Sequence, residues 1–154
     1  MANTEMLVKE LADKYGRNRE SLLPILQELI DERRYVNDET MINVARELDL
    51  SAAEVYGTAS FYSFIETEEV GKYVIRLCKT IVCDMKGKEN VLQAIENTLK
   101  SKVGQTTADK KFTLKTTNCL GWCHKGPAML INDEVYTELT PGKAIDIIES
   151  YINK

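Results

Sequence analysis

Residues 71–83, GKYVIRLCKTIVC, mark the point where the pattern of the chain changes. Large apolar residues recur at every second position from Tyr73 to Leu77, so they share one face of an extended segment. This alternation predicts a half-buried β-strand. The strand ends at Cys78, and Cys83 follows after four residues. The segment therefore predicts the first strand of a sheet, with two cysteines at its carboxyl end.

A helix and a second strand are expected after this segment. Apolar residues at helical spacing between Val91 and Leu99 indicate the helix, and residues 111–116, KFTLKT, alternate as a strand. A right-handed crossover through the helix makes the two strands parallel. Their carboxyl ends, which lead to Cys78 and Cys119, should then meet at the same edge of the sheet.

The last segment predicts a hairpin and a final helix. Residues 128–137, AMLINDEVYT, form two apolar runs around a turn at Asn132-Asp133. Thr140 can cap the helix, with Pro141 at its first position, where proline is favourable. The residues expected to face inward on this helix are Ala144, Ile145, Ile148 and Ile152.

Residues 1–66 predict a bundle of short helices with short connections. Asn37 or Asp38 can cap the third helix, and Ser51 with Glu54 forms a capping-box pattern at the start of the fourth. The whole chain is thus expected to be an α+β protein. A helical N-terminal arm over residues 1–66 would precede a thioredoxin-like α/β domain over residues 67–154, with the order β-α-β, then β-β-α.

The composition is that of a globular protein with an uneven charge. The chain has 154 residues, of which 44% are hydrophobic and 29% charged. No apolar run approaches the roughly 18 residues of a membrane span, and the N-terminus has no signal-peptide core, so we expect a cytoplasmic protein without membrane insertion. Residues 1–70 carry 15 acidic and 7 basic side chains, a net of −8, and residues 71–154 carry 9 and 13, a net of +4.

This charge asymmetry suggests two units with different partners, although solvated helix faces would also explain it. The basic half has no arginine-rich tract and no nucleic-acid motif, so a nucleic-acid partner is not expected. Four aromatic residues stand where the arm should meet the second domain, and they suit either a docking surface or packing between domains: Tyr56, Phe61, Tyr62 and Phe64.

Four cysteines, Cys78, Cys83, Cys119 and Cys123, form the pattern C-x4-C-x35-C-x3-C. Four converging thiolates suit zinc or an iron–sulfur cluster. Structural zinc favours C-x2-C knuckles, whereas the wider spacings fit a two-iron cluster, in which each pair of cysteines binds one iron. A Rieske centre needs two histidines, and His124 is the only one here. The spacing favours an iron–sulfur cluster, and zinc, a disulfide or a reactive thiol remain as alternatives.

Several segments resemble the small iron–sulfur subunit of NADH-dehydrogenase modules, and the similarity covers essentially the whole chain. They are GKYVIRLC (71–78), TTADKKFTL (106–114), NCLGWCHKGPAMLIND (118–133) and YTELTP (136–141). The resemblance implies a thioredoxin-like ferredoxin domain behind a helical arm. It also implies one [2Fe–2S] cluster, whose ligands carry over to the positions Cys78, Cys83, Cys119 and Cys123.

Two positions depart from the family pattern. Asp109 is followed by Lys110, where the family often has glycine, and Trp122 precedes the last cysteine, where a small residue is common. In this loop we expect Gly121 to let the backbone approach the cluster, Trp122 to shield it from water, and His124 to be an exposed loop residue.

Residues 74–88, VIRLCKTIVCDMKGK, most resemble the smallest subunit of multimeric NAD-linked [FeFe]-hydrogenases, including the electron-bifurcating type. That resemblance implies two partners: a flavoprotein subunit that holds FMN and NAD(H), and a catalytic [FeFe]-hydrogenase or related subunit. The chain itself has no glycine-rich nucleotide motif. We therefore expect an electron-transfer subunit without a catalytic residue of its own. The alternatives are a zinc-stapled or non-redox structural adaptor of the same kind of complex, and a standalone thiol oxidoreductase.

Overall fold

The computed structural model describes residues 2–154, which form two compact units. The first ends at Glu69 and the second comprises Val70–Lys154, whereas the sequence pattern suggests a boundary after residue 66. Within residues 2–154, no helix is long and apolar enough to cross a lipid bilayer.

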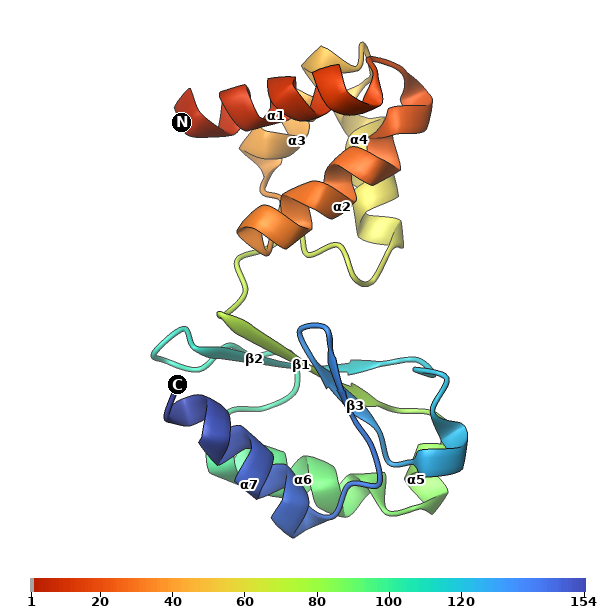
Figure 1. The fold of residues 1–154 in the computed structure, drawn as a ribbon, viewed down its shortest axis with the longest axis vertical. Coiled ribbons are helices and arrows are strands. Elements are labelled where there is room, and N and C mark those ends of the chain that lie inside the picture. Colours follow the sequence, from red (N-terminus) through yellow and green to blue (C-terminus); the bar gives the residue numbers. More distant parts are fainter. Residues whose placement is uncertain (1) are drawn as a thin grey trace. The chain divides into compact units, whose positions relative to one another are not determined.

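The first unit consists of short helices around an apolar core (Figure 1). The side-chain oxygen of Asn37 accepts a hydrogen bond from the backbone N–H of Thr40 at 3.0 Å, and Ser51 and Glu54 form both bonds of a capping box. Both predicted caps are confirmed. The helices are α1 (Ala2–Tyr15), α2 (Leu22–Arg33), α3 (Asp38–Glu47) and α4 (Ala52–Phe61), and a 3-10 turn, η1 (Arg19–Ser21), precedes α2.

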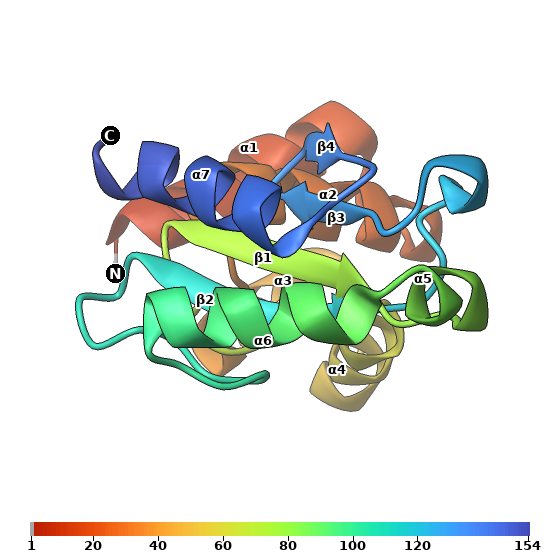
Figure 2. The same cartoon turned by 90° about the horizontal axis from the view of Figure 1, so that it is seen from below.

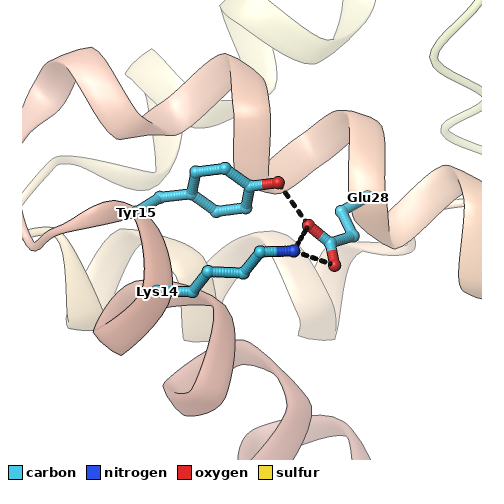
Figure 3. Close-up of polar contacts among 3 residues, drawn as sticks. All are labelled: Lys14, Tyr15 and Glu28. Carbon is cyan, nitrogen blue, oxygen red and sulfur yellow. Dashed lines mark hydrogen bonds and ion pairs between the residues drawn. The ribbon is translucent and has the colours of Figure 1, made fainter.

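A polar contact joins the end of α1 to the middle of α2 (Figure 3). The ammonium of Lys14 donates to both carboxylate oxygens of Glu28, at 2.8 and 2.9 Å, and the Tyr15 hydroxyl donates to one of them at 2.5 Å. The hydrogen bonds from Lys14 and Tyr15 lower the pKa of Glu28. Two adjacent residues of α1 thus converge on one carboxylate and fix the angle at which the two helices meet.

The second unit is a four-stranded sheet with the strand order β2-β1-β3-β4. The central strand β1 pairs in parallel with β2 and antiparallel with β3, and β3 and β4 form the predicted hairpin. The predicted order, β-α-β followed by β-β-α, is confirmed. The strands are β1 (Tyr73–Cys78), β2 (Phe112–Thr117), β3 (Met129–Ile131) and β4 (Glu134–Tyr136), and the two long helices are α6 (Lys88–Leu99) and α7 (Pro141–Ile152).

Helices α6 and α7 lie side by side against one face of this sheet (Figures 1 and 2). Ala144 and Ile148 of α7 are fully buried, as predicted, but Ile152 is 43% exposed. Tyr151 is buried in its place, because it lies one turn from Ile148 and its hydroxyl is satisfied by Glu134 at 2.6 Å. The prediction of an inward Ile152 was therefore wrong by one residue.

Two short helical turns in the second unit were not predicted. The cysteine loops were expected to be irregular, but the first contains a five-residue helix, α5 (Ile81–Met85), and the second contains a 3-10 turn, η2 (Cys123–Lys125). The turn before β2 forms even though Lys110 stands where the family often has glycine. Lys110 adopts the left-handed conformation with φ of 55°, which L-residues rarely take.

Gly71 is expected to control how β1 enters the sheet. Its N–H donates to the hydroxyl of Thr113 at 2.7 Å, and a Cβ at this position would lie 2.9 Å from backbone atoms of Lys111 and Phe112. Gly71→Ala should lower the free energy of unfolding by about 1–3 kcal/mol, because backbone atoms must move to admit the methyl group. Chemical denaturation of the purified chain measures this effect.

Gly142→Ala is the matched control, since no atom lies within 4 Å of the position of its Cβ. This change in the first turn of α7 should alter the free energy of unfolding by no more than about 0.5 kcal/mol. Equal denaturation midpoints for the two variants would show that β1 does not depend on close packing at Gly71.

Candidate metal centre

The parallel pairing of β1 and β2 sets the position of two cysteines. Cys78 is the last residue of β1 and lies opposite Thr117, the last residue of β2. The N–H of Lys79 continues the pairing by donating to the carbonyl of Thr117 at 2.9 Å. Cys119 follows two residues later. Both cysteines therefore leave the sheet at its carboxyl edge, as the sequence pattern predicts.

The first pair of thiols is buried. Cys78 and Cys83 are each 1% exposed, and their side chains are hydrogen-bonded to each other. Thr80 begins the helix α5 that carries Cys83, and its hydroxyl lies 3.1 Å from the Cys78 sulfur. Helix α5 thus turns the chain back so that Cys83 faces the end of β1.

The second pair of thiols lies closer to solvent. Cys119 is exposed and Cys123 half-buried, and their sulfur atoms are 3.1 Å apart. That separation is well beyond the length of a disulfide bond, about 2.05 Å, and all four cysteines are free thiols. Gly121 takes φ of 84°, and its N–H donates to the Cys119 sulfur at 3.3 Å. The backbone therefore already supplies one hydrogen bond to a sulfur of this pair.

The two pairs are neighbours in space. Gly126, three residues after Cys123, passes so close to Cys83 that a Cβ on Gly126 would lie 3.1 Å from the Cys83 sulfur. Cys123 also senses the charges of Cys83 and Cys78. The loop that carries the second pair thus packs directly on the helix that carries the first.

Ionisation of the four thiols is mutually unfavourable. Burial raises the pKa of Cys83, and the hydrogen bond with Cys119 raises the pKa of Cys123. Burial also acts to raise the pKa of Cys78, but hydrogen bonds from Thr80 and Cys83 outweigh it, so this pKa lies below its ordinary value. Four adjacent thiolates therefore require positive charge between them, which is what metal ions supply.

The thiols are arranged as two pairs. In the part of the chain that the structure describes, no group of three or more Cys, His, Asp or Glu side chains is placed to hold one metal ion. Two sulfur pairs at one sheet edge suit a two-iron cluster, because each iron takes two protein sulfurs and shares bridging sulfides with the other. The residues present therefore fit a [2Fe–2S] cluster.

The surroundings of the thiols are partly apolar. Trp122 is 38% exposed, so it covers this loop only in part, and its ring stacks on His124 with centroids 5.9 Å apart. Ile81 and Met85 of α5 are exposed on either side of the buried Cys83. Neither helix α5 nor the contact between Thr80 and Cys78 was predicted from the sequence; the only local signal was a threonine at a helix start.

Comparison with known proteins finds relatives over nearly the whole chain. The chain is 36% identical over 152 residues to a subunit of the NADH-quinone oxidoreductase of Buchnera aphidicola, covering 98% of this chain and 94% of that protein. It is 38% identical over 137 residues to the subunit of the same name in Escherichia coli K12, covering 89% and 82% of the two chains.

A solved structure has a similar fold. The crystal structure of an NAD+-reducing [NiFe]-hydrogenase in the H2-reduced state superposes with a TM-score of 0.79 at 25% identity. The match covers 90% of this chain but only 23% of the hydrogenase chain, so this chain corresponds to less than a quarter of that polypeptide.

The family assignment agrees with the resemblance found in the sequence and with the architecture of the second unit. Residues 8–152 match the sequence profile of the thioredoxin-like [2Fe–2S] ferredoxins. The chain therefore belongs to the thioredoxin-like [2Fe–2S] ferredoxin family, whose cofactor is a [2Fe–2S] cluster.

Proposed function

We propose that Cys78, Cys83, Cys119 and Cys123 bind this cluster and that the chain is an electron-transfer subunit. The observation that carries the proposal is the placement of two thiol pairs at the carboxyl edge of β1 and β2. When bound, a [2Fe–2S] cluster accepts and releases single electrons. The buried pair excludes water from one side of the site, and the N–H of Gly121 donates to a sulfur on the other.

We propose that electrons are exchanged with a flavoprotein subunit that holds FMN and NAD(H). The relatives at 36% and 38% identity are subunits of NADH-quinone oxidoreductases, and the structural neighbour is an NAD+-reducing hydrogenase. NADH delivers a hydride, which carries two electrons, whereas the cluster takes one. A flavin can divide the pair, so the proposed partner supplies the step that this chain lacks.

The finer assignment is to an electron-bifurcating [FeFe]-hydrogenase, with a catalytic [FeFe]-hydrogenase or related subunit as a further partner. Its support is the resemblance of residues 74–88 alone. The alternative of a zinc-stapled or non-redox adaptor keeps the same partners but predicts a colourless protein that contains zinc, so metal content separates the two functions.

We propose that the first unit is mainly a docking element for the flavoprotein. Its helices, from Ala2 onward, carry no cluster of chemistry-bearing residues. Residues 1–70 nevertheless have a net charge of −8, and Phe61 is 78% exposed and Tyr56 54% exposed on α4. Exposed aromatic side chains are frequent anchors of interfaces, and complementary charge sets the rate and orientation of association.

Replacing the proposed ligands tests the cluster site. The anaerobically purified chain should contain about two irons and give a paramagnetic signal after reduction. Cys83→Ser and Cys123→Ser should each lose most of the iron, because thiolate is the preferred ligand. Ile81→Ser, an exposed position on the same helix α5, is the control and should keep the iron. Stoichiometric zinc without iron in the reconstituted protein would contradict the proposal.

The division of labour with a flavoprotein is tested by mixing. NADH added anaerobically to the isolated chain should leave its visible spectrum unchanged, because the chain has no nucleotide motif. Dithionite should bleach the same sample, which controls for an inactive cluster. Adding a flavoprotein partner should then allow NADH to reduce the cluster. Rapid bleaching by NADH alone would overturn this assignment of roles.

The docking role is tested in the full chain by the double change Tyr56→Ser with Phe61→Ser. Loss of two exposed aromatic anchors should weaken binding to the flavoprotein by about tenfold or more, with the visible spectrum unaltered. The control is Met6→Ser on α1, which is comparably exposed and should bind normally. Affinity is measured by surface plasmon resonance, and unchanged affinity of the double variant would exclude this surface as the interface.

A further inference from the structure

We propose that Lys86 is a positioning residue for the cluster site: it holds the loop of Cys123 against the helix of Cys83 and keeps a positive charge beside them. This inference rests on the proposed function, since it assigns a role toward the cluster that the four cysteines would bind. Lys86 is not a ligand, and it acts through the backbone of the second cysteine loop.

The contacts of Lys86 span the two halves of the site. Lys86 ends α5, three residues after Cys83. Its ammonium donates to the carbonyl of Cys123 at 2.9 Å and to the carbonyl of His124 at 3.2 Å. These carbonyls belong to η2, the three-residue turn that includes Cys123. One side chain thus connects the element of the first thiol pair to the element of the second.

The two carbonyls explain why a cation belongs at this place. A helical turn as short as η2 leaves its carbonyls without partners in the turn, and their dipoles point toward the same side. A lysine near the end of a helix satisfies such carbonyls and interacts favourably with their partial negative charge. Lys86 therefore fixes the orientation of the backbone from which the Cys123 thiol projects.

Packing at Gly126 supports the same placement. A Cβ on Gly126 would lie 3.5 Å from Cδ of Lys86 and 3.1 Å from the sulfur of Cys83. The aliphatic stem of Lys86 and the Cys83 thiol therefore press on the same point of the second loop. The loop is held by both a polar contact and an apolar contact, each of them from α5.

The charge of Lys86 also favours the reduced cluster. A single electron entering the cluster breaks no bond but adds one negative charge to a centre already surrounded by four thiolates. A fixed ammonium beside Cys123 stabilises that added charge and so raises the reduction potential. The nearby Lys88 does not do the same, because it forms ion pairs with Asp84 at 3.2 Å and Glu89 at 3.3 Å.

The test compares two lysines that carry the same charge on either side of the site. Lys86→Met removes the charge and both hydrogen bonds but keeps the length of the side chain. Lys125→Met removes an equal charge from an exposed lysine of η2 whose ammonium has no partner among the described residues, 2–154. Lys86→Arg keeps the charge and the donors. The measurements are the rate of iron loss to a chelator and the midpoint potential, in the full chain.

Lys86→Met should lose iron roughly tenfold faster, as expected for a lost charge-assisted hydrogen bond, and its midpoint potential should fall. Lys86→Arg should restore both values, and Lys125→Met should stay close to the wild type. Failure of Lys86→Met to hold any cluster, while Lys86→Arg and Lys125→Met hold it, would also support the proposal. The proposal is overturned if Lys86→Met matches Lys125→Met in both measurements. A wild-type chain that binds no [2Fe–2S] cluster would instead overturn the proposed function.

Discussion

The parallel pairing of β1 with β2 is the constraint on which the candidate site depends. Only a parallel pair brings two carboxyl ends to one edge, and the register Cys78 opposite Thr117 places Cys119 just beyond the same edge. Side chains alternate between faces, so a slip of one residue would turn Cys78 to the other face of the sheet. The fully buried Ile75, Leu77 and Leu114 prevent such a slip, because it would expose them. The apolar core and the site are therefore specified by one register.

The two thiol pairs differ in exposure, and the difference suits an electron carrier. Cys78 and Cys83 are buried against the sheet, whereas Cys119 is exposed. The buried side limits access of water, which protects iron–sulfur bonds, and the open side leaves a short path to a partner. Met85, 82% exposed on α5, and the half-exposed Trp122 give that side apolar contacts of the kind found in protein interfaces.

Most elements with a strong local signal could be predicted from the sequence. The Ser51–Glu54 capping box, the Asn37 cap, the Asn132-Asp133 turn and the Pro141 helix start each depend on residues a few positions apart. Helix α5 could not be predicted in this way. It has only five residues, and Thr80 gives it no side-chain cap, so contacts with the sheet edge and the second loop must hold it.

The same reasoning explains what was missed within the site. The cysteine spacing identified four thiols, but the hydrogen bonds of Lys86 join residues 37 and 38 positions apart, and no local pattern reports them. At Lys110 the backbone adopts a left-handed conformation without glycine. The surrounding hydrogen bonds, from the N–H of Lys110 to Thr107 and from the N–H of Lys111 to Asp109, over-determine that turn. The relatives include part of a quinone reductase and part of a hydrogenase, so a site of this kind does not by itself select a complex. Selection must then come from surfaces outside the thiols, and the first unit offers both a strong negative charge and exposed aromatic side chains for it.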